Sequence, residues 1–272
     1  PSGLETIGDY AFYSATKLVD ITIPGSVKTI GVGAFRDCWK MTKATLPEGL
    51  ETIPRECFIG CRKLESVNIP DSVTTIGNMA FTGCALKEIN ISKNLTEISI
   101  PGYTFSGCPA AITVDAANPN YSADERGVLY NKDKSLLLHC PNFEKAFTFD
   151  INCNIDQYAF YNCANLTDVT FSYAIKKIPY AAFRNCGSLK ITTVPDTVRM
   201  IDQVAFDGCG MTEFYLPDSV EYVGTQAFSS TPLSLPDTSS FGLFFISSIL
   251  LLTIYFPLRA ISASKSSPLT VK

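Results

Sequence analysis

Residues that could act as nucleophiles, acids or bases are few in this 272-residue sequence and do not form a known catalytic pattern. The only histidine, His139, lies in the apolar run 136–140, which favours a strand residue over a general base. The sequence has no Gly-x-Ser-x-Gly or Walker motif, and Gly31-Val32-Gly33 lacks the third glycine of a dinucleotide-binding loop. We therefore expect no enzyme activity, no catalytic residue, no cofactor and no metal site.

The residues are organised instead by an internal repeat. Phenylalanines recur every 22 to 24 residues in two series, which are Phe12, Phe35, Phe58, Phe81 and Phe105, and then Phe160, Phe183, Phe206 and Phe228. Such a period is typical of a solenoid, because one unit cannot bury its large apolar side chain until a neighbouring unit stacks on it.

Each unit contains an Ala-Phe-x-x-Cys segment followed by Leu-x-x-Ile-x-Ile-Pro. The alternation in Val67-Asn68-Ile69 has a period of two and predicts a half-buried strand, which ends at Pro70 because proline has no N–H for the ladder. We interpret the Phe segment as a short helical turn. The fold predicted from these features is a leucine-rich-repeat solenoid with one strand and one helical turn per unit of about 23 residues.

The units resemble the leucine-rich repeats of the BspA-like surface antigens, which are found in oral bacteria and expanded in trichomonad parasites, over residues 1–236. The segment from Asn118 to Lys134 is similar to an irregular island that interrupts those arrays. The resemblance implies a surface antigen or adhesin with a protein or glycan ligand. We expect a first repeat array over 1–114, an island with a β-hairpin over 115–150, and a second array over 151–236.

Seven of the ten cysteines occupy one slot of the repeat, three residues after the phenylalanine. They are Cys38, Cys61, Cys84, Cys108, Cys163, Cys186 and Cys209. A ladder of buried free thiols explains the slot best, and disulfides between neighbouring units are the alternative, opposed by parallel Cβ directions. So many unpaired thiols indicate an intracellular or oxygen-poor setting. Cys57 and Cys61 have no second pair or nearby histidine for zinc.

The polar positions that flank the middle apolar residue of each strand face outward and form a predicted partner-binding face. The predicted contact residues are Asp20, Thr22, Lys43, Thr45, Ser66, Asn68, Glu88, Asp168, Thr170, Thr193, Glu213 and Tyr215. Ile191 occupies the corresponding position in its unit. The acids of this face belong to different units, so they do not form a catalytic pair, and a merely solvated sheet is the alternative reading of the whole strip.

Four Asn-x-Ser/Thr sequons, at Asn90, Asn94, Asn120 and Asn165, are possible glycosylation sites. A glycan on Asn90 would cover part of the proposed face.

The repeat stops after Pro236, and residues 241–258 carry no charge, which predicts a single transmembrane helix. All 26 acidic residues precede it, whereas Arg259, Lys265 and Lys272 follow. This asymmetry predicts a short basic cytoplasmic tail over 259–272 and repeats outside the plasma membrane. An apolar cap or an out-of-frame tail could also explain the segment.

The favoured hypothesis is a single-pass cell-surface protein that mediates adhesion or binds extracellular protein or glycan, such as host matrix or a host cell surface, through the outward face of its sheet. The alternative is an intracellular or secreted protein-interaction scaffold with an incidental hydrophobic tail. The formal charge of −4 gives nucleic acid no basic footprint.

Overall fold

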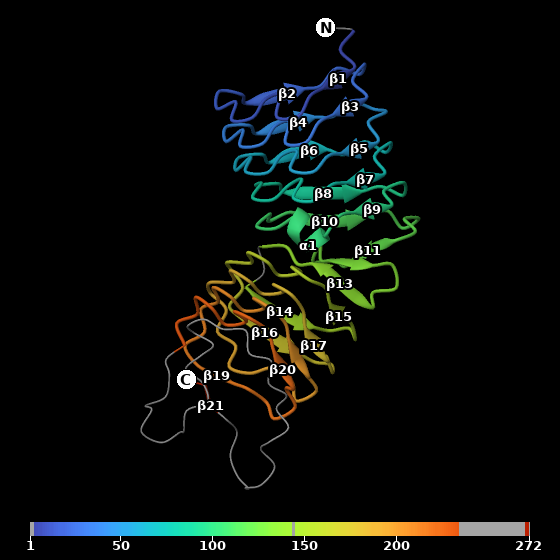
Figure 1. Ribbon diagram of the computed structural model, residues 1–272. Helices are drawn as coiled ribbons and strands as arrows, with labels where there is room; N and C mark the ends of the chain where they lie inside the picture. The colour runs from blue at the N-terminus through green and yellow to red at the C-terminus, as the bar shows by residue number, and fades with distance from the viewer. Residues whose placement is uncertain (1–2, 143–144, 234–269, 272) are drawn as a thin grey trace. The chain divides into compact units, whose positions relative to one another are not determined.

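The computed structural model describes residues 3–142, 145–233 and 270–271. They form a parallel β-solenoid of about nine turns, so the predicted solenoid is confirmed (Figure 1). The chain divides into two compact units, of which unit 1 comprises residues 1–143 and 158–160 and unit 2 comprises residues 144–157 and 161–272.

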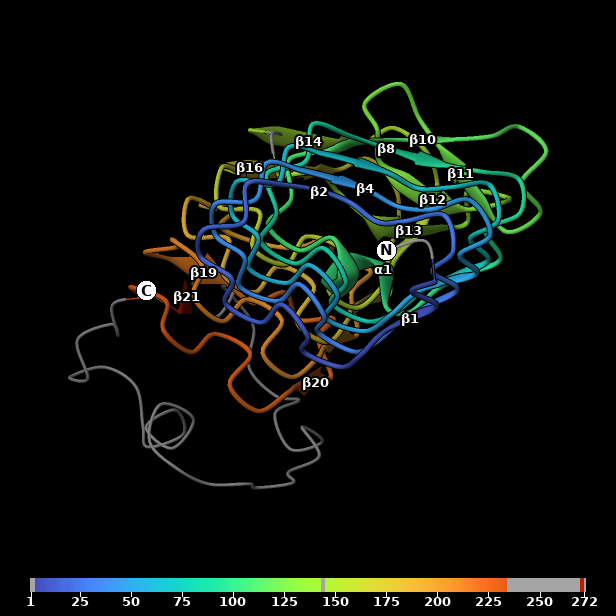
Figure 2. The ribbon, with the colours of Figure 1, turned by 90° about the horizontal axis from the view of Figure 1, so that it is seen from above.

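Each coil of unit 1 contributes two short strands rather than the single one that was predicted. The first row consists of β2 (Asp20–Thr22), β4 (Lys43–Thr45), β6 (Ser66–Asn68), β8 (Glu88–Ile91) and β10 (Ala111–Val114). The second row consists of β1 (Thr6–Ile7), β3 (Thr29–Ile30), β5 (Thr52–Ile53), β7 (Thr75–Ile76) and β9 (Glu97–Ile98). Figure 2, which looks down on unit 1, shows the first row and β1 on different sides of the coils.

The strands of each row pair in parallel, and every pairing advances by one repeat. In the first row, Ile21 lies beside Ala44, which lies beside Val67. The ladders are β2–β4–β6 and β8–β10 in the first row, and β1–β3 and β5–β7–β9 in the second. Equivalent residues of successive coils therefore lie one strand spacing, about 4.8 Å, apart.

The segment around each phenylalanine is not the predicted helical turn, except at Phe105, where the helix α1 (Pro101–Thr104) leads into the ring. In the other coils, the residues two before and two after the ring have positive φ, as Gly33 at 59° and Asp37 at 57° illustrate. The N–H of Arg36 bonds back to Gly33, but the N–H groups of Phe35 and Asp37 bond to the next coil. Left-handed residues interrupt a right-handed helix, so this side of the coil is a run of tight turns that hydrogen-bond from coil to coil.

The phenylalanine rings form a continuous stack inside unit 1. Ring centroids of neighbouring coils lie 5.1 to 6.0 Å apart from Phe12 to Phe105, and the planes are within 9° of parallel. The rings of Phe35, Phe58 and Phe81 are fully buried, whereas Phe12 is 38% exposed because no further ring covers it among the described residues. Offset stacks of this kind add to the free energy of burial.

The island between the two arrays contains an antiparallel sheet. Strands β11 (Tyr121–Ala123), β12 (Leu129–Asn131) and β13 (Leu136–His139) pair in sequence order, and the hairpin predicted between β12 and β13 is present. The buried Asn118 donates from Nδ2 to the carbonyls of Ser92 and Leu95, which fixes the island to the preceding coil. The helix α1 (Pro101–Thr104) has four residues.

Unit 2 repeats the two rows of strands with less regular pairing. Its strands are β14 (Ala146–Phe149), β15 (Asn154–Ile155), β16 (Asp168–Phe171), β17 (Lys177–Ile178), β18 (Met200–Ile201), β19 (Phe214–Tyr215) and β20 (Tyr222–Val223). Strands β14 and β16 form one parallel pair, and β17, β18 and β20 form a parallel sheet. Phe183, Phe206 and Phe228 stack at 5.4 Å per step.

The predicted transmembrane segment 241–258 lies outside the described residues. In the part of the chain that the structure describes, no helix has the length and apolar character needed to cross a membrane. The strand β21 (Thr270–Val271) pairs antiparallel with β19. A spanning helix at 241–258 would put β21 on the other side of the membrane from β19, so this pairing and a spanning helix exclude each other.

The stack predicts unequal effects for two phenylalanines of the same slot. Phe58→Ala removes a fully buried ring that stacks on both sides, and we expect it to lower the free energy of unfolding by about 3–5 kcal/mol. Phe12→Ala removes a partly exposed ring with a stacking partner on one side, so its effect should be clearly smaller. Urea denaturation followed by circular dichroism measures both losses, and equal losses would refute the stack as the core.

Candidate binding face

The predicted contact residues of unit 1 form a regular polar row on the first strand of each coil. Asp20, Lys43 and Ser66 are neighbours across β2, β4 and β6, and Thr22, Thr45 and Asn68 form the parallel line beside them. Thr45 is half-buried and the other five are exposed. The prediction that these positions face outward is confirmed for this sheet.

Part of this row stabilises the coils and is not free for a ligand. The side-chain amide of Asn68 donates to the carbonyl of Leu46 at 3.1 Å and accepts the N–H of Leu46 at 2.7 Å. Oδ1 of Asp20 accepts the hydroxyl of Thr42 at 2.7 Å. Glu88 is exposed on β8, but β8 pairs with β10 and not with β6, so it begins a separate sheet.

The corresponding strand positions of unit 2 lie in less regular coils. Asp168 and Thr170 are exposed on β16, Thr193 is exposed beyond it, and Glu213 and Tyr215 are half-buried. Thr193 makes a single parallel bridge to Tyr215. The outward assignment of Ile191 is wrong, because its side chain is buried and the two threonines that follow are both exposed. The alternating pattern is lost at this coil.

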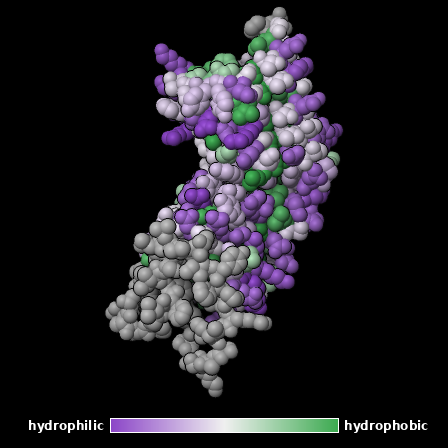
Figure 3. Space-filling model, in the orientation of Figure 1, coloured by the Kyte–Doolittle hydropathy of each residue, from purple (hydrophilic) through white to green (hydrophobic). Residues whose placement is uncertain are grey.

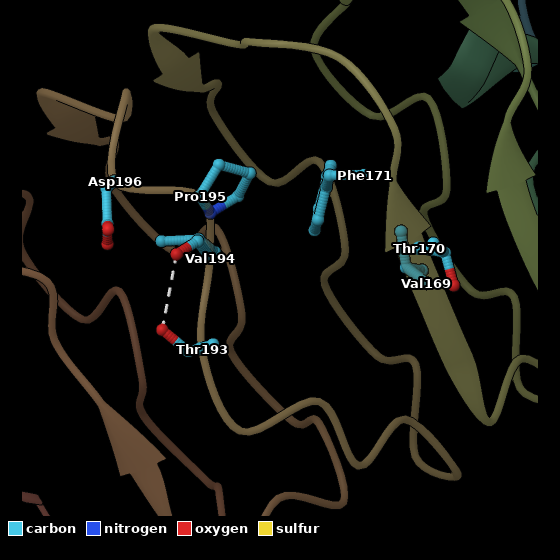
Figure 4. Close-up of a pocket in the computed structure, with 7 residues that line it drawn as sticks. All are labelled: Val169, Thr170, Phe171, Thr193, Val194, Pro195 and Asp196. Atoms are coloured by element: carbon cyan, nitrogen blue, oxygen red, sulfur yellow. Dashed lines mark hydrogen bonds between the residues drawn. The ribbon is translucent and has the colours of Figure 1, made fainter.

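A shallow hollow opens in unit 2 where the regular pairing stops (Figure 4). It is lined by Val169, Thr170, Phe171, Thr193, Val194, Pro195 and Asp196. β16 pairs only with β14 in the described sheet, although the coils still meet before the hollow, where the N–H of Lys190 bonds to the carbonyl of Thr167 at 3.0 Å. Two predicted contact residues, Thr170 and Thr193, thus lie on opposite sides of one opening.

The polar groups at the hollow are suited to hydrogen bonding and not to covalent chemistry. The N–H of Val169 donates to Oδ1 of Asp168 at 2.9 Å. Thr193 donates from its hydroxyl toward the carbonyls of Tyr215 at 3.0 Å and Val194 at 3.2 Å. The ring of Phe171 stacks on Phe149 at 5.3 Å and gives one wall a rigid apolar surface. Such a site can hold an extended chain or a sugar by shallow contact.

Sequence reasoning missed several residues of this face. Thr113 on β10 lies beside Asn90 on β8. Thr148 on β14 lies beside Thr170 on β16. Both threonines are therefore outward positions of the first strand of their coils. Repeat spacing alone would have found them. The walls formed by Phe171 and by residues 194–196 carry no such signal, because they depend on where two coils separate.

His139 is buried, with 2% of its surface exposed, and neither ring nitrogen has a hydrogen-bond partner in the described structure. Its ring packs against Phe105 with centroids 5.6 Å apart. Burial lowers the pKa of His139 to about 3, so the ring is neutral at physiological pH. This places the residue in the core of unit 1, away from solvent that could carry a substrate to it.

All ten cysteines are buried and none forms a disulfide, as the buried-thiol interpretation predicted. Sγ atoms of Cys38, Cys61 and Cys84 each bond to a carbonyl of the preceding coil at 3.1 to 3.2 Å. Burial raises the pKa of Cys108 to about 11 and also raises that of Cys84 and Cys186. These thiols stay protonated and unreactive at neutral pH.

No group of three or more His, Cys, Asp or Glu side chains that could hold a metal ion occurs among the described residues. The sequon residues Asn90, Asn94, Asn120 and Asn165 are all exposed. The side-chain amides of Asn94 and Asn120 donate to carbonyls of the preceding coil at 2.8 Å.

Comparison with known proteins identifies a repeat family and structurally similar proteins. A family model described as BspA type leucine rich repeat region matches residues 1–112 and 140–256 in six copies. A leucine rich cell surface protein from Faecalibacterium prausnitzii is structurally similar, with 25% identity, a TM-score of 0.54 and coverage of 85% of this chain and 82% of that one. The pneumococcal vaccine antigen PcpA has 19% identity, a TM-score of 0.64 and coverage of 85% and 66%. No curated protein matches.

The burial of His139 predicts a specific pH dependence of stability. The pKa is about 3 in the folded protein and 6.5 in the unfolded chain, so below pH 6.5 the unfolded chain binds a proton that the folded protein does not. Stability is therefore lost as pH falls, by about 1.4 kcal/mol per pH unit. His139→Leu should remove this component, and urea denaturation of both proteins at pH 7 and pH 5 measures it. The same loss in both proteins would contradict the burial of a neutral histidine.

Proposed function

Because the chain belongs to the family of BspA-type leucine-rich-repeat proteins, we propose that it is a binding protein whose outward sheet row engages a protein or glycan partner. The proposal assigns no catalytic step and no cofactor to the chain. The row offers hydroxyl, amide and charged groups at regular intervals along the coils, which suits contact with an extended partner.

The observation that carries this proposal is the hollow between Thr170 and Thr193. A flat polar row provides many weak contacts but little specificity, whereas a hollow can orient one group of the partner. Here the two hydroxyls, the carboxylate of Asp196 and the ring of Phe171 surround one opening. We propose that this hollow is the anchoring point and that Tyr215 extends the contact through the bridge at Thr193.

We further propose that the repeats are displayed at the cell surface and mediate adhesion. The exposed sequons, the acidic repeats, the uncharged segment 241–258 and the basic residues after it support this location. The similar protein from Faecalibacterium prausnitzii is described as a cell surface protein. The proposal requires that β21 leave β19 when residues 241–258 enter a membrane.

An intracellular or secreted scaffold is the second candidate, and the cysteines favour it. Ten cysteines without a disulfide in one chain are unusual for an oxidising compartment. In this case the same face would bind a partner protein, and β21 would keep its pairing with β19.

Substitution across the hollow tests the binding face. The triple variant Thr170→Lys, Thr193→Lys and Tyr215→Lys adds bulk and charge to exposed or half-buried positions, so it should fold normally and lose binding at least about tenfold. The purified protein is applied to an array of immobilised matrix proteins and glycans, and the strongest signal is then titrated. Gln203→Lys, Thr225→Lys and Gln226→Lys add the same charge at exposed positions elsewhere in unit 2 and form the control. Unchanged binding by the first variant would refute the site.

Protease protection on intact cells tests the location. The chain carries an epitope tag after Lys272. We expect added protease to remove the repeats and to leave a short tagged fragment that the membrane protects. A fully protected chain would instead establish the intracellular scaffold. Release of intact repeats and tag together into the medium would establish the secreted form.

A further inference from the structure

The corner that leads into the first strand row carries a column of lysines in the first three coils. Lys17, Lys40 and Lys63 occupy the same repeat slot, and all three are exposed. The loops before β2, β4 and β6 form one edge of unit 1 in Figure 1, and hydrophilic side chains project from that edge in Figure 3. None of the residues assigned to the binding face belongs to this column.

The three lysines are held in one geometry. Each is the third residue of a turn closed by a backbone hydrogen bond of 2.9 to 3.0 Å, from Leu18 to Ala15 in the first coil and by the equivalent pairs in the next two. Three residues later the strands are in strict register, since Asp20 lies beside Lys43 and Lys43 beside Ser66. The lysine Cα atoms therefore repeat about every 4.8 Å along a straight line.

Two of the acids nearest in the sequence already pair with other cations. Asp37 pairs with Arg36, and Glu65 pairs with Lys87 at 2.6 Å. Asp20 accepts the hydroxyl of Thr42 and keeps its charge. Within the described residues, Lys17, Lys40 and Lys63 form no ion pair. Like charges at this spacing repel each other.

The turn itself does not require lysine. In the second array the same slot holds Asn165 and Ser188, and the turns there are closed by the same bond, from Leu166 to Cys163 and from Leu189 to Cys186. An uncharged residue thus serves the backbone equally well. The charge of the first three coils has no structural explanation in the turn.

Two further side chains make the column more than a row of lysines. Arg62 precedes Lys63, is exposed, and likewise has no ion pair in the described part of the chain. Trp39 precedes Lys40 and is the only tryptophan of the sequence, and 51% of its surface is exposed. An exposed indole beside a line of cations can pack against a sugar ring while the cations hold its acidic groups.

We propose that this column, formed by Lys17, Trp39, Lys40, Arg62 and Lys63, binds a linear sulfated polysaccharide. A linear polyanion presents its charges along one axis, so it can contact all three lysines together, whereas a compact anion reaches only part of the line. Nucleic acid is the other linear polyanion of this kind, and the experiment below separates the two. This inference does not depend on the hollow in unit 2.

Trp39 provides a direct test, because it is the only tryptophan in the protein. The full chain is titrated with a heparin-derived octasaccharide while its tryptophan fluorescence is recorded. We expect a saturable change that weakens with added salt, and the triple variant Lys17→Gln, Lys40→Gln and Lys63→Gln should bind about tenfold more weakly. Lys28→Gln, Lys93→Gln and Lys176→Gln remove the same charge from exposed positions outside the column and should bind as the wild type does.

Three results would overturn the proposal. One is the absence of a saturable change in fluorescence on addition of the octasaccharide. Another is an equal loss of affinity in the two triple variants, which would assign the effect to overall charge. The third is tighter binding of a single-stranded oligothymidylate than of the octasaccharide in the same assay, which would assign the column to nucleic acid. The Thr170, Thr193 and Tyr215 variant should retain octasaccharide binding, so failure here and failure of the proposed function are distinguishable.

Discussion

The structure depends on the stacking of one phenylalanine per coil. A single coil has too little apolar surface to bury a ring, and its strands of two to four residues are too short to be stable alone. Each ring becomes buried only when the next coil covers it, so stability is shared between neighbours. The position of the ring in the stack is therefore kept even where the spacing changes, since Phe81 and Phe105 are 24 residues apart and still stack at 6.0 Å.

The stack also explains the other invariant features of the coil. The chain must turn around the ring within a few residues. Except at Phe105, it does so with left-handed residues two before and two after the phenylalanine, some of which are not glycine, such as Val204. Their strain is offset by hydrogen bonds to the next coil. The cysteine slot lies directly under this turn, where a small side chain is needed and where Sγ can bond to a carbonyl of the preceding coil.

The candidate binding features arise where the repeat is either least or most regular. The hollow of unit 2 lies where the segment at Ile191 forms no strand that pairs with β16 and makes only the bridge from Thr193 to Tyr215. The basic column of unit 1 exists because three coils are in strict register, so that one residue type in one slot becomes a line. The repeat fixes the backbone of each coil. The residue type at one repeat position varies between coils and gives each region of the surface its own chemistry.

The period of the phenylalanines determined the solenoid and the coil boundaries, because each coil must bury one ring. The local sequence pattern determined the buried cysteine slot and the outward direction of most strand residues. The second strand row was missed because two residues, such as Thr52 and Ile53, are too few to show a period. The helical turn was wrongly expected because the signal in residue type is only partial. Two residues after the ring the slot holds mostly Gly, Asn or Asp, as at Asp37, which favour positive φ. Two residues before the ring, Glu56 and Val204 adopt positive φ without such a preference. Only the tertiary structure revealed that the side chain of Ile191 is buried and that the side chain of Asn68 is hydrogen-bonded to the backbone of Leu46. It also revealed that Thr170 and Thr193 line one hollow. These features depend on how far neighbouring coils separate.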